Sequence, residues 1–323
     1  MTTKVFFIFP GQGAQYPGMG LDLLEQPLQS NGGDRIKRLF TLASGITGTD
    51  MADLIGNSSP ETLKRTDISQ PAITLVNLAA MALLAEKGIK PQGCAGFSLG
   101  EYSALVAAGV ISEEDCIYLV NRRGIAMQAA IDSIPKGSSA PGMAAVVGLA
   151  PEKVEELIAE WKNTGLTDLN AANINSPIQV AVSGSSAAID EAEKRFKAAG
   201  ARRFMRLQVA GPYHSPFMKE AAREFNYFLE NVRFRNPTIP LFSNVTGKQI
   251  RNGAEAKALS HMHISQGVRW TDEEAAMACL EPELILEVGP GKVLQGLWKD
   301  SGSSIPCYGA GTAQEINKLA EGI

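Results

Sequence analysis

A serine between two glycines is the first group in this sequence that could carry covalent chemistry. Residues 96–100 read GFSLG and fit the pattern G-x-S-x-G, in which a sharp turn from strand to helix exposes a serine hydroxyl. The glycines favour such a turn because side chains on either side of it would clash. Ser98 could instead cap a helix, since serine is common at helix starts. The pattern alone leaves both interpretations open.

A nucleophilic serine needs a base, and the chain contains only three histidines. His214 lies in VAGPYHSPFM, a loop sequence from which a side chain can project into a cleft. His261 and His263 alternate in SHMHIS like two metal ligands, but the sequence has no third ligand at a suitable spacing. We therefore predict no metal site and interpret SHMHIS as an ordinary surface or half-buried strand.

The glycine-rich stretch FPGQGAQ (9–15) follows the first apolar run of the chain. It lacks the Lys-Ser/Thr pair of a phosphate-binding loop, so we do not expect nucleotide binding there. Its position would let the backbone N–H of Gln12, together with that of Leu99, stabilise an oxyanion formed at Ser98. A purely structural turn is the alternative.

Two adjacent arginines, Arg122 and Arg123, have apolar neighbours on both sides in a predicted helix. At least one of them must therefore point toward the core. A buried guanidinium needs an anionic partner. That partner could be an Asp or Glu of the protein or the carboxylate of a ligand, held through two hydrogen bonds.

The segments that would position these residues follow an α/β pattern. KVFFIF (4–9) predicts a strand buried on both faces. Start and stop signals, including a proline near the start of the first, predict helices over 70–88, 98–109 and 112–131. Later in the chain we predict a helix over 215–232 and strands over 239–245 and 284–291. GPGKVL (289–294) could bring helix N–H groups to a phosphate, but we favour a simple strand-to-helix turn.

The middle of the chain has a different pattern, strand-helix-strand-strand-helix-strand. The predicted strands are 142–149, 169–176, 177–184 and 202–209, and the predicted helices are 151–163 and 185–200. This βαββαβ order is that of a ferredoxin-like unit, whose two ends lie close together. A unit of this kind suits insertion into a larger domain. We therefore predict a ferredoxin-like subdomain at residues 141–209.

The composition of the 323-residue chain excludes several classes of partner. A net charge of −4 offers no overall positive field for nucleic acid or an anionic membrane. The apolar stretches VFFIF and VNLAAMALLA are shorter than a signal-peptide core or a membrane span needs. The four cysteines are scattered and form no CxxC pair, as in a reducing compartment. These features predict a cytoplasmic protein.

Taken together, these motifs resemble the malonyl-CoA:acyl carrier protein transacylases of fatty acid synthesis and the related acyltransferase domains of polyketide synthases. The resemblance covers nearly the whole chain, through FPGQGAQ, SQPAI, GFSLGEYSALVAAG, NRRGIAMQ, AGPYHSPFM, SNVTG and LEVGPGKVL. It implies an α/β fold in which an α/β-hydrolase-like core with a parallel sheet, residues 1–140 and 210–323, carries the inserted subdomain.

The resemblance also assigns roles to individual residues. It implies that Ser98 is the nucleophile, that His214 is its base, and that Arg123 binds the free carboxylate of a malonyl group. Gln12 and Leu99 match the positions whose N–H groups form the oxyanion hole.

The resemblance also covers two supporting residues, and the sequence differs from the family pattern at one position. Gln70 matches a glutamine lining the site, and Asn244 matches the position whose backbone carbonyl orients the histidine. The family usually has histidine before the nucleophile, where this chain has Phe97. A phenyl ring cannot donate a hydrogen bond to the malonyl group, so Arg123 would recognise the carboxylate more nearly alone.

The function implied is ping-pong transfer of malonyl from malonyl-CoA to the phosphopantetheine thiol of an acyl carrier protein, by a monomer without a permanently bound cofactor. Carrier proteins of this kind are acidic, so basic residues near the inserted subdomain could form a docking face, although a solvated charge run is the alternative. They are Lys194, Arg195, Lys197, Arg202, Arg203 and Arg206.

Three rival functions stay open at this point. A related acyl hydrolase would pass the acyl group to water, and a noncatalytic relative would use the fold only for binding. A generic lipase or esterase would need a third triad member. The candidates for that third member are Asp132, Asp168 and Asp190. The sequence does not distinguish fatty acid from polyketide synthesis.

Overall fold

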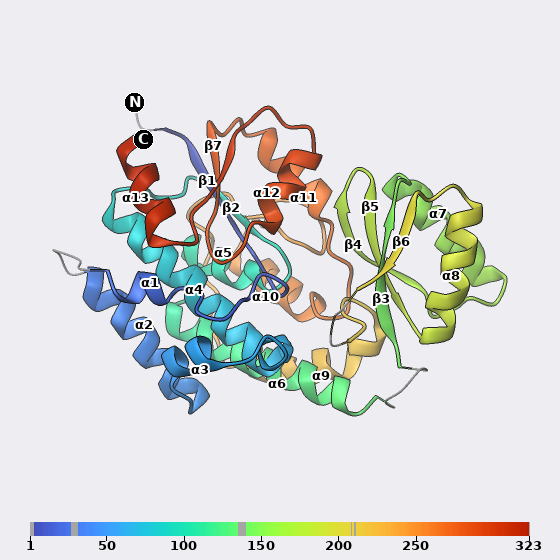
Figure 1. Ribbon diagram of the computed structural model, residues 1–323, viewed down its shortest axis with the longest axis horizontal. Coiled ribbons are helices and arrows are strands. Elements are labelled where there is room, and N and C mark those ends of the chain that lie inside the picture. Colours follow the sequence, from blue (N-terminus) through green and yellow to red (C-terminus); the bar gives the residue numbers. More distant parts are fainter. Residues whose placement is uncertain (1–2, 27–31, 135–139, 208, 210, 323) are drawn as a thin grey trace.

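The computed structural model describes residues 3–26, 32–134, 140–207, 209 and 211–322. Its strands form two separate sheets, which lie side by side in Figure 1. Most helices surround the first sheet, and two cover one face of the second. The chain is therefore a mixed α/β protein with one parallel and one antiparallel sheet.

The first sheet is parallel throughout, with the strand order β2-β1-β7-β8. Its strands are β1 (Val5–Phe9), β2 (Cys94–Gly96), β7 (Leu284–Glu287) and β8 (Cys307–Gly309). Every residue of β1, β2 and β7 is buried, as a strand covered on both faces requires. This confirms the buried strand predicted from KVFFIF.

The second sheet is antiparallel, with the order β4-β5-β3-β6. It comprises β3 (Gly142–Val147), β4 (Asn170–Ser176), β5 (Gln179–Gly184) and β6 (Arg203–Arg206), with helices α7 (Pro151–Asn163) and α8 (Ser186–Ala198). Side chains such as Val146, Trp161 and Phe196 form a separate hydrophobic cluster between this sheet and its helices. The order of strands and helices along this segment is the one that the sequence predicts.

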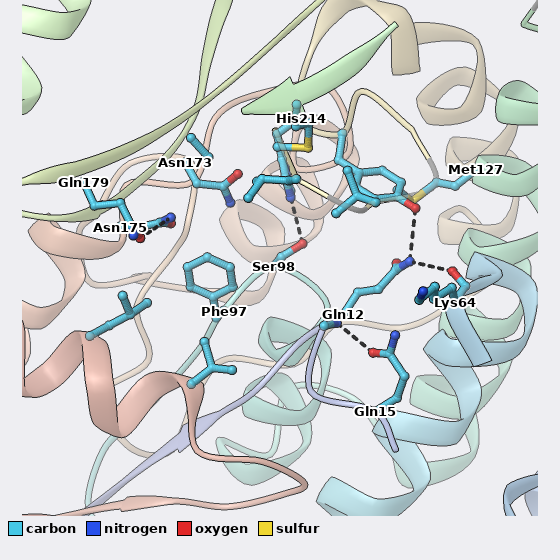
Figure 2. Close-up of a pocket in the computed structure, with 18 of the residues that line it drawn as sticks. Gln12, Gln15, Lys64, Phe97, Ser98, Met127, Asn173, Asn175, Gln179 and His214 are labelled. Atoms are coloured by element: carbon cyan, nitrogen blue, oxygen red, sulfur yellow. Dashed lines mark hydrogen bonds between the residues drawn. The ribbon is translucent and has the colours of Figure 1, made fainter. Parts of the chain in front are cut away.

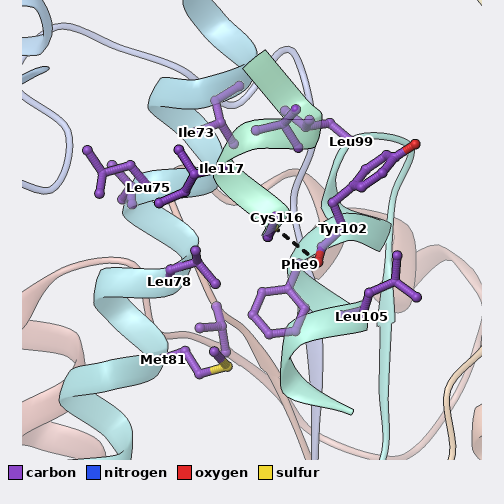
Figure 3. Packing of buried hydrophobic residues seen from close by; sticks show 14 of the residues in the cluster. Phe9, Ile73, Leu75, Leu78, Met81, Leu99, Tyr102, Leu105, Cys116 and Ile117 are labelled. Atoms are coloured by element: carbon purple, nitrogen blue, oxygen red, sulfur yellow. Dashed lines mark hydrogen bonds between the residues drawn. The ribbon is translucent and has the colours of Figure 1, made fainter. Parts of the chain in front are cut away.

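The core beside the parallel sheet is built on three helices, α4 (Thr66–Glu86), α5 (Gly100–Ala107) and α6 (Glu113–Asp132). Side chains of these helices meet Phe9 of β1 in one apolar cluster (Figure 3). The helix α6 begins as predicted, with the Ser112 hydroxyl accepting a hydrogen bond from the N–H of Asp115. This core packs against β1 and β2, which lead into the glycine-rich loop FPGQGAQ and into the turn that contains Ser98.

The remaining helices cover the outside of the core. They are α1 (Leu21–Leu24), α2 (Gly32–Thr47), α3 (Met51–Asn57), α9 (Lys219–Leu229), α10 (Gly253–Met262), α11 (Trp270–Ala278), α12 (Val293–Asp300) and α13 (Ala313–Gly322), with short 3-10 helices at Thr62–Lys64 and Pro216–Met218.

Helix α4 differs from its prediction because it begins at Thr66, one turn earlier than the expected start at Gln70, so Pro71 lies inside it. The added turn is held by hydrogen bonds from Thr66 to α6, a long-range contact that a local start signal does not contain. By length and composition alone α4 could cross a membrane, but 89% of its most apolar window is buried inside the fold. It is a core helix.

Two predicted strands near the site also differ. The segment expected as a strand over 239–245 makes only isolated bridges, Cys94 with Leu241 and Phe242 with Gln249. The expected strand SHMHIS is wrong, because His261 lies in helix α10 and His263 caps its end. Buried Leu259 and Ser260 lie three and four residues after buried Ala256, and buried His263 lies four and three residues after them, which is a helical period.

Candidate active site

The serine at the centre of G-x-S-x-G occupies the sharp turn between β2 and α5. Ser98 has φ 50°, a left-handed conformation that is unusual for a residue other than glycine. A Cβ at Gly96 would overlap the backbone of Gly100, and one at Gly100 would overlap the carbonyl of Phe9. Both flanking positions therefore require glycine, as the motif predicts. The N-cap of α5 is Leu99, so Ser98 does not cap the helix.

The Ser98 hydroxyl faces His214, and Oγ lies 2.8 Å from Nε2 of the imidazole (Figure 2). The other ring nitrogen, Nδ1, lies 3.0 Å from two backbone carbonyl oxygens, those of His263 and Gln266. Because carbonyl oxygens only accept hydrogen bonds, Nδ1 must carry the proton. Nε2 is then unprotonated and accepts the hydroxyl hydrogen, which is the arrangement that a general base requires.

The imidazole of His214 is held in its neutral form. Its pKa is lowered to about 4, first because the ring is buried and second because the positive charge of Arg123 lies nearby. The two carbonyl contacts oppose this shift only partly. At neutral pH the ring is therefore free to take the Ser98 proton.

Among the described residues, no carboxylate bonds to Nδ1 of His214 to form a triad with His214 and Ser98. Each aspartate proposed for that place has another partner: Asp132 accepts from Gln128, Asp168 from the N–H of Ser185, and Asp190 pairs with Arg206. None of the three aspartates that the sequence left open therefore completes a lipase-type triad. The peptide carbonyls of His263 and Gln266 stand where that carboxylate would be.

The expected role of Asn244 needs correction. Its backbone carbonyl accepts a hydrogen bond from the N–H of Arg269 and does not contact His214. Its side-chain oxygen instead accepts from the N–H of Ser98, at 2.6 Å. Asn244 thus supports the nucleophile, and His263 supplies one of the two carbonyls that orient the base.

Sequence reasoning missed His263 because a peptide carbonyl has no signature of its own. The side chain was interpreted as part of a strand, but it is fully buried beside His214 and Asn244. The helical spacing of buried residues in α10 was the one signal in the sequence that could have identified it. Among the described residues, no group of three or more potential ligands is arranged to hold a metal ion.

Of the two adjacent arginines, Arg123 is the one that points inward. It is 1% exposed and lines the pocket beside Ser98. Its Nη1 donates to Oε1 of Gln70 at 2.9 Å, while Nε and Nη2 have no hydrogen-bond partner among the described residues. Arg122 instead lies against the rings of Tyr118 and Phe228. A buried guanidinium with two unpaired nitrogens is suited to an anionic ligand.

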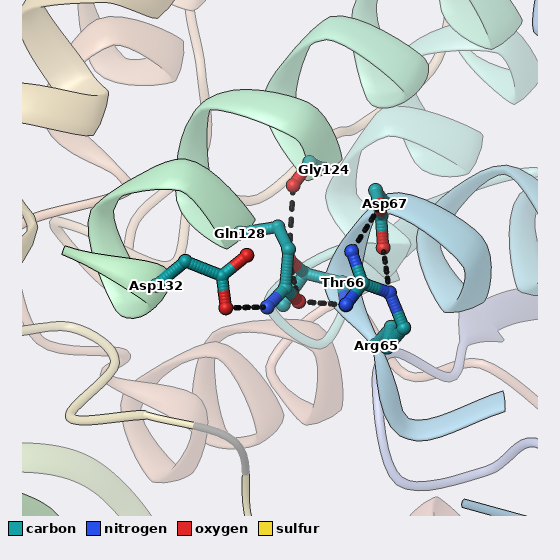
Figure 4. A network of polar contacts seen from close by, with 6 residues as sticks. All are labelled: Arg65, Thr66, Asp67, Gly124, Gln128 and Asp132. Atoms are coloured by element: carbon teal, nitrogen blue, oxygen red, sulfur yellow. Dashed lines mark hydrogen bonds and ion pairs between the residues drawn. The ribbon is translucent and has the colours of Figure 1, made fainter. Parts of the chain in front are cut away.

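Close contact between α4 and α6 brings Gln70 to Arg123. Figure 4 shows the polar contacts of Thr66 with Gly124 and Gln128 that join the two helices. Thr66 donates from its backbone N–H to Oε1 of Gln128 and from its hydroxyl to the carbonyl of Gly124. A Cβ at Gly124 would lie 2.5 Å from the Thr66 carbonyl oxygen. The glycine directly after Arg123 therefore allows the two helices to approach.

The loop after β1 lies against the serine turn, as an oxyanion loop must. A Cβ at Gly11 would overlap the carbonyl of Phe97 and come within 3.3 Å of the N–H of Leu99. The N–H groups of Gln12 and Leu99 donate to no described group of the protein, which leaves them available to an oxyanion. The Gln12 side chain donates to the hydroxyl of Tyr213 at 3.1 Å.

These groups line one pocket of about 290 Å³ between the two sheets. Ser98, His214, Arg123 and Gln12 come from the parallel-sheet side, and strands β4 and β5 contribute the opposite wall (Figure 2). That wall carries the amides of Asn173, Asn175 and Gln179.

Phe97, the residue before the nucleophile, forms part of the same pocket. Its ring packs edge-to-face on Trp270, with the centroids 5.4 Å apart. The side chain therefore provides an apolar wall beside Ser98, where an imidazole would provide a polar one.

In the turn GPGKVL, N–H groups at the start of α12 are already paired within the protein. The carboxylate of Glu287, just before it, accepts hydrogen bonds from the N–H groups of Leu294 and Gln295 at the start of α12. These donors, which could have bound a phosphate, are occupied. The favoured interpretation, a strand-to-helix turn, fits this arrangement.

Comparison with known families gives a match over almost the whole chain. The sequence profile described as "Acyl transferase domain" matches residues 6–319. The malonyl CoA-acyl carrier protein transacylase of Bacillus subtilis is 35% identical over 297 residues, covering 92% of this chain and 90% of the relative. The protein of the same name from Escherichia coli is 37% identical over 299 residues, covering 92% of each chain.

Solved structures agree with these sequence matches. An acyl carrier protein S-malonyltransferase from Vibrio cholerae has a TM-score of 0.89 at 34% identity, covering 98% of this chain and all of the other. A malonyl-transacylase solved with its type II polyketide acyl carrier protein has a TM-score of 0.89 at 32% identity, covering 99% of this chain and 100% of that chain.

Proposed function

This chain belongs to the acyl transferase family and is an acyltransferase of the malonyl-CoA:acyl carrier protein transacylase group, and we propose that it works through a malonyl ester on Ser98. The observation that carries the proposal is the contact of 2.8 Å between Ser98 Oγ and the unprotonated Nε2 of His214. The incompletely paired guanidinium of Arg123 lines the same pocket. The two groups together suit an acyl donor that carries a negative charge.

In the first half-reaction, His214 takes the proton of Ser98 as the hydroxyl oxygen attacks the thioester carbonyl of malonyl-CoA. The N–H groups of Gln12 and Leu99 stabilise the resulting oxyanion, each worth about 3 kcal/mol of barrier. The C–S bond then breaks, and His214 returns its proton to the CoA sulfur. The products are free CoA and malonyl-Ser98.

In the second half-reaction, the phosphopantetheine thiol of an acyl carrier protein enters the pocket and loses its proton to His214. Its sulfur attacks the ester carbonyl, and the proton passes to Ser98 as the C–O bond breaks. The wall formed by Asn173, Asn175 and Gln179 offers amide groups along the path of the arm. The serine is regenerated, and the two half-reactions make a ping-pong cycle.

We propose that Arg123 selects the acyl group by charge, with Gln70 fixing its orientation. Gln70 occupies one guanidinium nitrogen and donates through its own Nε2 to the sulfur of Met127. The N–H groups of Nε and Nη2 can bind a carboxylate. An acetyl group would leave them buried and unpaired, which disfavours it.

A transfer assay with both acyl donors tests this function. The protein is mixed with acyl carrier protein bearing phosphopantetheine and with either malonyl-CoA or acetyl-CoA, and the carrier is weighed by mass spectrometry. We expect malonyl-carrier from malonyl-CoA, much less acetyl-carrier, and no product with Ser98→Ala. Release of free malonate in place of malonyl-carrier would identify a hydrolase and contradict the proposal.

We also propose that the chain divides into a core and an inserted subdomain. We assign residues 1–140 and 210–323 to an α/β-hydrolase-like core and residues 141–209 to a ferredoxin-like subdomain. The strand order β4-β5-β3-β6, with α7 and α8 on one face, supports this assignment. We further propose a cytoplasmic monomer that acts without a resident cofactor.

Fewer of the basic residues predicted for the carrier-docking face remain candidates for it. Lys194, Arg195, Lys197 and Arg206 pair with neighbouring carboxylates, which reduces their field. Arg202 and Arg203 are exposed, and no ion pair involves them among the described residues. They lie at the start of β6, and its continuation, Leu207 and Val209, lines the pocket. We propose that these two arginines attract the acidic carrier.

A further inference from the structure

We propose that the side chains of Asn244 and His263 are positioning residues that hold Ser98 in its reactive conformation. His263 fixes the amide of Asn244, and Asn244 fixes the backbone N–H of Ser98. The reaction they assist is the proposed one, so the inference rests on the proposed function. The side chains of Asn244 and His263 are fully buried, and neither lines the pocket.

The orientation of the Asn244 amide follows from two backbone contacts. Its Nδ2 lies 2.6 Å from the carbonyl oxygen of Gly96, which only accepts, and its Oδ1 lies 2.6 Å from the N–H of Ser98, which only donates. The oxygen and nitrogen therefore cannot be exchanged. Nδ2 also donates to Oε1 of Glu273 at 2.9 Å. The amide bridges the residues on both sides of Phe97.

The tautomer of His263 follows in turn. Its Nε2 lies 3.0 Å from Oδ1 of Asn244, and an amide oxygen only accepts, so Nε2 must carry a hydrogen. Nδ1 is buried and has no partner among the described residues. Burial, aided by the nearby charge of Arg123, keeps the pKa of the ring well below its usual range. His263 is therefore a neutral donor and completes the four hydrogen bonds of the Asn244 amide.

The same residue also contacts the base through its backbone, because the carbonyl of His263 accepts from Nδ1 of His214. One residue at the end of α10 therefore contacts His214 directly and Ser98 through Asn244. The serine needs this support because its backbone is in the left-handed region. The Asn244 oxygen gives its N–H a partner at that turn.

Three variants separate the side-chain role of His263 from its backbone role. His263→Leu removes the Nε2 hydrogen but keeps the backbone carbonyl. His263→Gln keeps an N–H donor on a side chain that can reach Asn244. His261→Leu makes the same exchange two residues away, at a half-exposed histidine that does not line the pocket. If His263→Leu does not fold, His263→Met replaces it, because methionine adapts to irregular space.

The readout is the second-order rate constant for modification of Ser98 by diisopropyl fluorophosphate, which needs neither malonyl-CoA nor a carrier protein. The kcat and KM for malonyl-CoA are measured beside it, with circular dichroism to verify folding. A displacement of about 1 Å at a reacting group can reduce the rate by about 100-fold. We expect His263→Leu to lower the rate constant for modification of Ser98 and the kcat for malonyl-CoA by about 10- to 100-fold, with KM little changed.

The comparison of His263→Gln with His263→Leu tests the inference. We expect His263→Gln to recover both rates to within about threefold of the original protein, and His261→Leu to leave them unchanged. Original rates in His263→Leu, or equal losses in His263→Gln and His263→Leu, would overturn the inference. If the original protein transfers no malonyl group but its phosphorylation shows this pattern, the proposed function fails and the positioning role stands.

Discussion

The ring of His214, which we propose as the base, is oriented by two peptide carbonyls, those of His263 and Gln266. A carboxylate in that place would stabilise the protonated imidazole by charge, whereas a carbonyl offers only its dipole. Burial and Arg123 then dominate and lower the pKa of His214 to about 4. The dyad should therefore keep working at acidic pH, where a histidine with an ordinary pKa of about 6.5 would be protonated.

The pH profile of acylation tests this consequence. Because the neutral ring is the active form, the rate of Ser98 malonylation should be constant at neutral pH and fall as pH drops through about 4. The measurement is the single-turnover rate between pH 4 and pH 8, with circular dichroism to show that the protein stays folded. An acid limb near 6.5 would show that the ring is not desolvated as described.

Substitution of Arg123 tests acyl selection. Arg123→Ala removes the unpaired nitrogens Nε and Nη2, so kcat/KM for malonyl-CoA should fall by about 100-fold or more while acetyl transfer is retained or rises. Arg122→Ala is the matched control, since Arg122 packs on Tyr118 and Phe228 and does not line the pocket. The measurement is the ratio of the two specificity constants. An unchanged ratio in Arg123→Ala would remove the arginine from substrate recognition.

Residue types alone marked Ser98 and His214 as candidates for a nucleophile and its base, and the family resemblance singled out Arg123 from its neighbour Arg122. The sequence could not predict that carbonyls of His263 and Gln266 hold the base, because every residue has a carbonyl and only the fold selects which ones point at the ring. The role of the Asn244 side chain was missed for the same reason: its partners, such as Gly96, are distant in sequence.

Among the elements, the contact between α4 and α6 matters most for the site, because it brings Gln70 and Arg123 together. The contact depends on Gly124, whose missing Cβ leaves room for the carbonyl of Thr66. A motif in which glycine follows the arginine therefore has a packing reason as well as a chemical one.

Gly124→Ala should separate the two helices. The added methyl group has a backbone oxygen 2.5 Å away, so we expect a loss of about 1–3 kcal/mol in unfolding free energy and a higher KM for malonyl-CoA. Gly296→Ala in α12 is the control, because nothing lies within 4 Å of its added Cβ; better helix propensity should stabilise it by up to about 1 kcal/mol. Urea unfolding compares the two. Equal changes in unfolding free energy for Gly124→Ala and Gly296→Ala would show that the close approach of α4 to α6 is unimportant.

The elements most accurately predicted are those with strong local signals. Ser112 and three acidic residues mark the start of α6, and the βαββαβ order was readable from alternating periods. The start of α4 and the helix α10 were not, because Thr66 is held by distant Gln128 and the alternating histidines of SHMHIS imitate a strand. A tertiary contact therefore extended α4, whereas in α10 the helical spacing of the buried residues outweighed the alternating histidines.

For the molecule as a whole, the pocket lies between the two sheets, so each supplies one wall. The sequence predicted both the α/β character and the middle segment, but not which face of that segment meets Ser98. That relation depends on packing between segments far apart in the chain. In the proposed mechanism, the carrier protein approaches at the mouth of this pocket so that its arm can reach the serine.

Charge reversal tests the proposed approach of the carrier. Arg202→Glu with Arg203→Glu should raise the KM for carrier protein by about tenfold at low salt, with less effect at high salt, because exposed charges mainly steer association. Malonylation of Ser98 by malonyl-CoA should stay close to normal. Lys87→Glu with Lys90→Glu changes the net charge equally at exposed sites outside the pocket. Equal changes in KM for both pairs would rule out a local docking face.

The central claim is that Ser98 carries the malonyl group between donor and acceptor, and trapping that ester tests it most directly. The protein is incubated with malonyl-CoA without carrier protein, quenched in acid and weighed intact, and the modified peptide is sequenced by mass spectrometry. The account predicts one malonyl adduct, located on Ser98, absent from Ser98→Ala, and lost when carrier protein is added as malonyl-carrier appears. An adduct that persists in Ser98→Ala, or malonyl-carrier formed by that variant at the original rate, would contradict it.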